Sequence, residues 1–420
     1  MKRRHAVPSS SFLAPLGAFR SPGFRSYIAG QCISLLGSWI QRIAQNWVAF
    51  ALTHSPFWLG VIACVASVPM LILAPFAGVL ADRFPRKTLF LLTQAIEMVA
   101  ALILAVLMFR GLIRIEHLIA LSLCFGVTTA LGEPARQALL SDLVDRDAIA
   151  SGLALNATMN NLAGVLGSAL AGILLVQVGT AWCFLLNSLS YLAVIASLFF
   201  VHVPLQEKKQ ESHRAHLQHL RNGFRFAQHH RTIAPLLLLA LVVNLFGINP
   251  ITTLLPAFAS LSLHVSQPGY ALLNAALLGG SVLASLLNVW VGQSIGRGRL
   301  IVIVSLLLPL GGILLALMKA MLPATVLIGA LGIGFTLFFV TCNTLIQKEV
   351  PNEYRGRVMS LWSMIRFGLA PVSILGLAAF AQLVSTMTTF IVCSIVSGVF
   401  CAWIILLAPD LRSLHEEREF

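Results

Sequence analysis

Four charged residues lie inside long apolar runs of this sequence, away from any turn: Arg42, Glu97, Glu133 and Arg366. A charge at mid-bilayer depth is expensive, so it usually faces a water-filled cavity or a partner of opposite charge. An arginine in such a place can attract an anionic or carboxylate-bearing molecule. A carboxyl group there can take up and release protons. The alternative is that Arg42 pairs with Glu133 or Glu97 only to hold the structure together.

The first apolar run carries its polar residues on one side. Helical spacing of three and four residues places Ser38, Arg42 and Gln45, with the adjacent Asn46, in a narrow arc. Arg42 is near the middle of this run. We therefore expect Arg42, Gln45 and Asn46 to line a substrate cavity.

Two residues of the second half of the chain are candidates for the same cavity. Asn244 precedes Pro250, which predicts a break in its helix, and hydrogen bonding between helices is an equally good interpretation of this asparagine. Arg366 lies about ten residues into its own apolar run, with Ser360 and Ser363 at helical spacing. It would serve either the substrate or a gate.

Coupling to protons requires an acid whose charge changes between states. Glu133 is the first candidate because it follows Thr128 and Thr129 in the inner half of its run. Glu97 is the second candidate, and a structural pairing of Glu97 is the alternative.

The most concentrated charged motif is the turn between the second and third runs, residues 78–87, which reads G-V-L-A-D-R-F-P-R-K. Two membrane helices joined so tightly can place Asp82, Arg83, Arg86 and Lys87 only at one water interface. Gly78 lets a neighbouring helix approach closely. For the bases alone, the excess of positive charge that cytoplasmic loops carry is an alternative explanation.

Composition identifies an integral membrane protein. Hydrophobic residues make up 58% of the chain and charged residues 10%, whereas about a quarter of a soluble domain is charged. The 420 residues accommodate roughly twelve spanning helices. The net charge of +13 resides in loops, which argues against nucleic-acid binding. Neither the seven cysteines nor the histidines have metal-ligand spacing, and no nucleotide-binding loop or catalytic motif is present.

The apolar runs predict an all-α protein of twelve transmembrane helices in two pseudo-symmetric six-helix bundles. We expect a cytoplasmic tail at 1–24, bundles at 25–203 and 233–409, a cytoplasmic linker at 204–232 and a tail at 410–420. In our assignment 23 of the 28 bases fall on the side of the termini, which places both termini in the cytoplasm. The expected helices span about 24–52, 57–81, 88–109, 116–140, 148–178, 181–203, 234–262, 268–293, 300–319, 323–347, 357–383 and 387–408.

The turn at 78–87 resembles the signature loop between the second and third helices of the major facilitator superfamily, with Pro85 where that family usually has glycine. The resemblance implies that Gly78, Asp82, Arg83, Arg86 and Lys87 form a gating latch. It also implies that Asp142 meets Arg86 in this latch.

Three further stretches resemble the exporter branch that includes the enterobactin exporter and the macrolide efflux proteins. They are residues 133–144 (E-P-A-R-Q-A-L-L-S-D-L-V), residues 347–359 (Q-K-E-V-P-N-E-Y-R-G-R-V-M), and the pair of segments 256–258 and 269–270. The antiporter pattern of the fifth helix is only partly present, at Gly167, Ser168, Ala171 and Gly172.

The resemblance predicts a proton-coupled exporter of a small amphipathic or carboxylate-bearing molecule, such as a siderophore or a drug, working by alternating access. An importer of an iron chelate or a lipid transporter is the alternative within the fold, and a non-transporting sensor or scaffold is the alternative outside it. We expect a monomer in a bacterial inner membrane, with no enzymatic activity, cofactor or metal. Substrate, direction and coupling ion stay open.

Overall fold

The computed structural model describes residues 21–144, 148–200, 225, 226, 228, 230–294 and 296–408, and this part of the chain is helical with no strand. The predicted tails, apart from residues 21–24, and nearly all of the predicted linker lie outside the described residues. The helices of the N-terminal half are α1 (Pro22–Thr53), α2 (Pro56–Arg83), α3 (Arg86–Phe109), α4 (Ile115–Asp142), α5 (Ile149–Gln177) and α6 (Thr180–Phe199).

Two helices of the C-terminal half are interrupted by π-helical turns, in which the backbone is wider than in an α-helix. The seventh predicted helix is built from α8 (Ile233–Val242), η3 (Val243–Ile248), α9 (Asn249–Ala257) and η4 (Phe258–Ser262). The eleventh is built from α13 (Asn352–Ser363), η5 (Met364–Gly368) and α14 (Ala370–Leu383). The others are α10 (Gln267–Ser294), α11 (Arg297–Leu317), α12 (Met321–Glu349) and α15 (Thr386–Leu407).

Local sequence explains where several of these helices begin and end. The Ser21 hydroxyl accepts a hydrogen bond from the Phe24 amide at 3.4 Å, and Pro22 occupies the first turn, so α1 starts with a normal cap. Gly179 and Gly296 turn the chain before α6 and α11 with φ values of +89° and +86°. Only glycine adopts that conformation without strain.

Eleven helices of the described residues are long and apolar enough to cross a membrane. The twelfth expected span, α1, has 32 residues, which is more than long enough to cross a membrane. It is less apolar than the other eleven. Its sequence includes Gln31, Gln41, Arg42, Gln45 and Asn46. The helix that is least apolar is therefore the one whose polar arc was expected to line a cavity. The protein is a multi-pass membrane protein of the expected all-α class.

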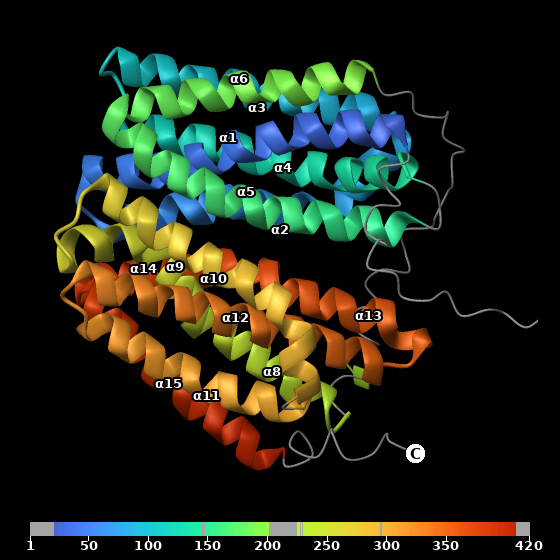
Figure 1. Cartoon of the computed structure of the whole chain (residues 1–420), viewed down its shortest axis with the longest axis vertical. Helices are drawn as coiled ribbons and strands as arrows, with labels where there is room; N and C mark the ends of the chain where they lie inside the picture. The colour runs from blue at the N-terminus through green and yellow to red at the C-terminus, as the bar shows by residue number, and fades with distance from the viewer. Residues whose placement is uncertain are drawn as a thin grey trace, which may run out of the picture.

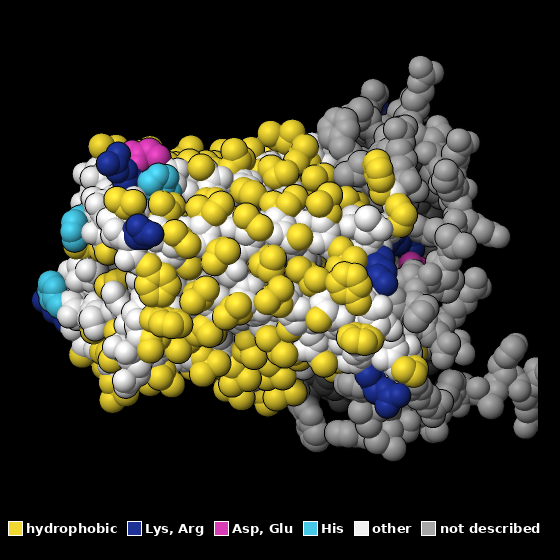
Figure 2. Space-filling view, turned by 90° about the horizontal axis from the view of Figure 1, so that it is seen from above, with side chains coloured by type: hydrophobic (Ala, Val, Ile, Leu, Met, Phe, Trp, Pro, Cys, Tyr) yellow, Lys and Arg dark blue, Asp and Glu magenta, His cyan; other side chains and the backbone are white. Residues whose placement is uncertain are grey.

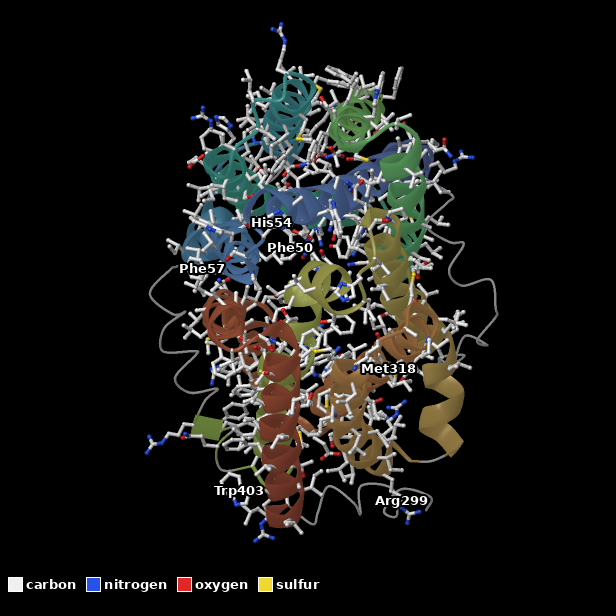
Figure 3. The ribbon with its side chains drawn as sticks, turned by 90° about the vertical axis from the view of Figure 1, so that its left-hand side faces the viewer. Phe50, His54, Phe57, Arg299, Met318 and Trp403 are labelled. Atoms are coloured by element: carbon white, nitrogen blue, oxygen red, sulfur yellow. The ribbon has the colours of Figure 1, made fainter. Side chains whose placement is uncertain are left out.

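The six helices of each half lie together, the N-terminal half above the C-terminal half in Figure 1. An apolar surface covers most of the face seen in Figure 2, with charged and histidine side chains toward its ends. We call the end that holds His54, Gly179, His264 and Ser385 the distal end, and the opposite end, where α1 begins and α15 finishes, the terminal end. Phe50, His54 and Phe57 lie close together in the view onto the distal end in Figure 3.

The two halves meet in the distal part and the middle of the molecule. At the distal end, the Ser55 hydroxyl lies 2.7 Å from the Gln382 side-chain oxygen. Below it, α2 approaches α14 at Gly60 and Ala378, and α5 approaches α10 at Gly172 and Ala271. Toward the terminal end the ribbons of the two halves diverge (Figure 1). The described contacts thus close the distal end.

Candidate functional site

A cavity of about 340 Å³ lies inside the N-terminal half, between α1, α3, α4, α5 and α6. Its volume is at the lower end of the range for small-molecule sites. All three charged residues that the sequence singled out in this half line it: Arg42, Glu97 and Glu133. A fourth charged residue, Arg136, and the asparagines Asn156 and Asn160 line it as well.

Arg42 is an exposed side chain in the middle of α1, and the space it faces is this cavity. Its guanidinium lies 4.5 Å from the centre of the Trp39 ring, one turn toward the terminal end. Neither Glu97 nor Glu133 forms an ion pair with it; in the described part of the chain these acids have other partners. The alternative of a purely structural pair with those two acids is therefore wrong. Arg42 presents an uncompensated positive charge to the cavity.

Glu97 on α3 is 9% exposed and is held by neutral groups. Gln94 donates to one carboxylate oxygen at 3.0 Å, and the Thr128 hydroxyl of α4 donates to the other at 2.9 Å. The Tyr191 hydroxyl of α6 also hydrogen-bonds this carboxyl group. No lysine or arginine of the described residues forms an ion pair with Glu97. A buried carboxyl group without a cation is suited to exist in both protonation states.

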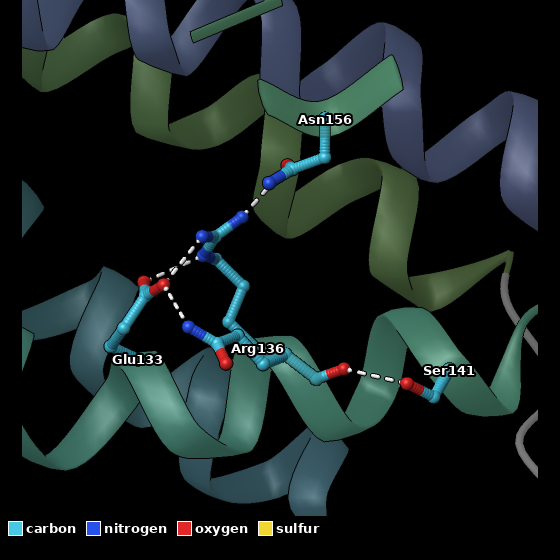
Figure 4. A network of polar contacts seen from close by, with 5 residues as sticks. Glu133, Arg136, Ser141 and Asn156 are labelled. Atoms are coloured by element: carbon cyan, nitrogen blue, oxygen red, sulfur yellow. Dashed lines mark hydrogen bonds and ion pairs between the residues drawn. The ribbon is translucent and has the colours of Figure 1, made fainter. Parts of the chain in front are cut away.

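Glu133 has a different environment, shown in Figure 4. The Arg136 guanidinium binds it with two hydrogen bonds of 2.8 and 2.6 Å, and Gln137 donates a third at 2.9 Å. Arg136 also donates to the Asn156 side-chain oxygen of α5 at 2.9 Å. A bidentate pair of this kind stabilises the charged carboxylate. This geometry favours Glu97 over Glu133 as the proton carrier, the reverse of the order expected from sequence.

Arg136 is the charged residue that sequence reasoning missed, because it was counted among the bases on the terminal side. The signal that could have found it is its spacing of three residues from Glu133, which puts both side chains on one face of α4. Tyr191 was also missed. A tyrosine in an apolar run gives no sign from sequence that its hydroxyl will meet a buried carboxyl group.

Gln45 and Asn46 do not line the cavity. Gln45 donates to the Ser122 hydroxyl at 2.7 Å and so ties α1 to α4 within the N-terminal half. Asn46 lies across the junction of the halves, where its amide is 3.4 Å from the Tyr270 hydroxyl of α10. Both contacts are polar links between helices, which are common in membrane bundles.

Asn244 is 2% exposed and its amide donates to the backbone oxygens of Ile365 at 2.9 Å and Arg366 at 3.3 Å. Those carbonyls belong to the π-helical turn η5, so Asn244 has the interhelical role that was one of its two predicted roles. Arg366 itself lies with its guanidinium 3.7 Å from the centre of the Phe339 ring. It forms no ion pair among the described residues, and it does not line the cavity of the N-terminal half.

The predicted latch is described only in part. Arg86, at the start of α3, donates to both carboxylate oxygens of Asp142, at the end of α4, at 2.9 and 2.8 Å. Lys87 follows in the same first turn and is half-buried. Gly78, Asp82 and Arg83 belong to the last turns of α2, and the places of their side chains lie outside the described residues.

The small residues of α5 make close helix contacts. A side chain at Gly167 would meet Trp39, and one at Gly164 would meet both Trp39 and Leu278 of α10. Trp39 therefore packs against α5 where the glycines leave room for its ring. The ring in turn positions the Arg42 guanidinium, which stacks on it. No group of three or more potential metal ligands occurs among the described residues.

Known proteins match this chain over most of its length. A family model described as "Transmembrane secretion effector" matches residues 10–419. The staphyloferrin A transporter of Staphylococcus aureus is 24% identical over 87% of this chain and 91% of its own length. The enterobactin exporter EntS of Salmonella typhimurium is 26% identical over 81% of both chains, and macrolide efflux protein A of Streptococcus pyogenes is 22% identical over 94% of this chain and 96% of its own.

Solved structures share the fold at low sequence identity. A POT family transporter in complex with 5-aminolevulinic acid superposes with a TM-score of 0.74 over 93% of this chain and 97% of its own, at 12% identity. A bacterial homologue of the iron transporter ferroportin in an inward-facing state gives 0.68 over 93% and 99%, at 15% identity. At such identities the likeness extends to the fold only.

Proposed function

Because this chain belongs to the transmembrane secretion effector family of the major facilitator superfamily, we propose that it is a proton-coupled exporter of a small anionic or carboxylate-bearing molecule. The observation that carries this proposal is Arg42. It is an exposed arginine at mid-span with no acidic partner among the described residues. A cation held there without a protein counter-ion favours an anionic ligand over a cationic one.

The names of the relatives support the same substrate class. Two of them are a transporter and an exporter named for staphyloferrin A and enterobactin, and a third is named for macrolide efflux. We therefore propose a siderophore or a related anionic chelator as the substrate, ahead of a cationic drug. The cavity of about 340 Å³ would hold one arm of such a molecule, and the rest would extend into the space between the halves.

Glu97 is the residue that we propose as the proton carrier. Its hydrogen-bond donors, Gln94 and Thr128, can retain a protonated carboxyl group as well as a charged one, because both side chains also accept hydrogen bonds. In the antiport that we propose, Glu97 releases its proton to the cytoplasm before the anion binds there. It takes up a proton from the far side after the anion has left, so that proton and anion cross the membrane in opposite half-cycles.

The charged turn at 78–87 supports our proposal for the orientation in the membrane. We propose that the terminal end is cytoplasmic, that the protein resides as a monomer in a bacterial inner membrane, and that the described conformation is open toward the cytoplasm. The Arg86–Asp142 pair, with Gly78, Asp82, Arg83 and Lys87, would act as a latch at the cytoplasmic end when the halves rock.

The test is uptake into inverted membrane vesicles, with and without an imposed proton gradient. The panel contains a tricarboxylate chelator, a catecholate chelator and a cationic macrolide. Gradient-dependent uptake of an anionic chelator is the expected result. Uptake of the macrolide alone would overturn the anionic substrate class, and accumulation only in right-side-out vesicles would reverse the direction to import. Absence of flux for the whole panel would favour lipid transport or a non-transporting role.

A further inference from the structure

Tyr270 is the residue at which the cavity-lining helix α1 meets the opposite half of the protein. It lies in the first turn of α10 and is 0% exposed. Its ring stacks on Trp47 of α1, with centroids 6.0 Å apart and planes inclined by 25°. Its hydroxyl accepts a hydrogen bond from Asn46 of α1 at 3.4 Å. Both partners belong to the N-terminal half, so this one side chain joins the two halves by a stacked ring and by a polar contact.

The residue before Tyr270 is tightly packed. The preceding residue is Gly269, where an added side chain would come within 2.6 Å of Val265. A larger residue at position 269 would therefore displace the Val265 side chain or shift the first turn of α10. The pair Gly269–Tyr270 is also one of the segments that stood out in the sequence, and the proposed transport chemistry gives it no role.

The contact lies directly on the distal side of Arg42. Asn46 follows Arg42 by four residues, so the two share a face of α1 and are separated by one helical turn, about 5.4 Å along the axis. The Tyr270 hydroxyl, which meets Asn46, therefore lies against the side of α1 that also carries Arg42. Since Tyr270 is buried at an interface that must separate, its hydroxyl would be a poor choice for packing alone, where phenylalanine would serve.

We propose that Tyr270, with Asn46 and Trp47, forms the distal gate, and that the gate senses whether an anion occupies Arg42. This rests on the proposed alternating access of an anion. With Arg42 unoccupied, its positive charge favours the Tyr270 oxygen as an electron-rich neighbour and stabilises the closed contact. An anion on Arg42 neutralises that charge, weakens the contact and allows the halves to separate at the distal end.

A second hydrogen bond between the halves at the distal end differs from the Tyr270 contact in its exposure, and this difference supports Tyr270 as the gate. The other described hydrogen bond between the halves at this end joins Ser55 and Gln382, and Gln382 is exposed. Water can replace such a contact at little cost when it breaks. Of these two hydrogen bonds, the one to Tyr270 is the less exposed and is the nearer to Arg42 along α1, so it is a link through which occupancy of the cavity can reach the distal end.

The experiment is amide hydrogen exchange of the full chain in lipid nanodiscs, without substrate or proton gradient, so that it does not depend on the proposed substrate or coupling. Peptides from residues 46–53 and 268–276 report on the distal end, and peptides from residues 86–92 and 341–349 report on the terminal end. Tyr270→Ala should raise exchange at the distal end roughly fivefold or more. It should lower exchange at the terminal end, because the two ends open alternately.

Tyr270→Phe keeps the ring and should give a smaller change of the same sign. It also keeps the test informative if Tyr270→Ala folds poorly. Leu272→Ala is the matched control, since Leu272 lies on the same helix and is 49% exposed; it should leave both ends unchanged. Arg42→Gln should mimic the occupied state by raising distal exchange, and its effect combined with Tyr270→Phe should be less than the sum of the two.

Two results would overturn the gate. One is unchanged distal exchange in both Tyr270 variants. The other is a rise at both ends together, which would indicate a general loss of stability. Additive effects of Arg42→Gln and Tyr270→Phe would reject the link to Arg42, because independent sites contribute additively.

Discussion

Among the described residues, the intramembrane charges of the N-terminal half lie around a polar cavity, whereas in the C-terminal half Arg366 lies against the Phe339 ring. In the first half Arg42, Glu97, Glu133 and Arg136 all face one space. In the second, the unusual features are π-helical turns at residues 243–248, 258–262 and 364–368. Such turns are frequent at functional sites. Here the Ile365 and Arg366 carbonyls of one such turn accept hydrogen bonds from the Asn244 side chain. Under the proposed function, the N-terminal half would recognise the ligand and the proton, and the C-terminal half would supply helices that can adapt.

The largest effect that would test this contrast concerns the Glu133–Arg136 pair. Removing either partner leaves a charge in the membrane interior without its partner, so Glu133→Ala or Arg136→Ala alone should lower the free energy of unfolding by about 3 kcal/mol. The value is at the lower end of the range for buried pairs because the Glu133 side chain is 28% exposed to the cavity. The double variant should lose less than either single one. Thermal unfolding in detergent measures this, and an additive double variant would show that the pair is not coupled.

A second prediction separates the two acids. Glu97→Gln keeps a side chain that can hydrogen-bond both Gln94 and Thr128, accepting with its oxygen and donating with its amide. It cannot take up a proton, so gradient-driven uptake should fall roughly 5-fold to 150-fold, the range of an ordinary coupling free energy. Exchange of substrate across the membrane without a gradient should persist. Glu133→Gln is the matched control. Even if less of this variant folds, the uptake by the folded fraction should still respond to the gradient. The reverse pattern would restore Glu133 as the proton carrier.

The smallest effect is expected in the C-terminal half. Asn244→Ala removes the donor to the Ile365 and Arg366 carbonyls and should destabilise the protein by about 0.6 kcal/mol, the average for hydrogen bonds between membrane helices. Asn249→Ala is the comparison, because its contact with Ser373 is longer, at 3.5 Å. If Asn244→Ala abolished transport while leaving stability unchanged, this half would have a direct role in recognition.

Helix bounds and fold class could be predicted closely from the sequence because spanning length and apolar composition are local properties. Helix α4 was expected at 116–140 and is found at Ile115–Asp142. The break expected near Pro250 appears as η3, immediately before that proline. A proline cannot donate to the backbone oxygen four residues earlier, which explains why the helix widens there.

The partners of the charged residues could not be predicted, because they depend on how helices pack. The sequence does not reveal that Arg136 takes Glu133 or that Thr128 and Gln94 hold Glu97. The same limit explains why Gln45 and Asn46, predicted to line the cavity with Arg42, instead join helices. Helical spacing placed these residues on one side of α1, where Ser38 and Arg42 line the cavity. It could not divide that arc between the cavity and the neighbouring helices.

The measurement that tests the central claim most directly compares Arg42 and Arg366, intramembrane arginines of the two halves that form no ion pair among the described residues. Binding of a tricarboxylate chelator to the purified protein is measured by calorimetry for the wild type, Arg42→Ala, Arg42→Lys and Arg366→Ala. Loss of a charge-assisted contact of about 1.5–3 kcal/mol should weaken binding by roughly tenfold to a hundredfold in Arg42→Ala. Arg42→Lys should recover part of this loss, and Arg366→Ala should bind nearly as the wild type does. Equal binding by Arg42→Ala and the wild type, or a larger loss in Arg366→Ala, would contradict recognition by the N-terminal half.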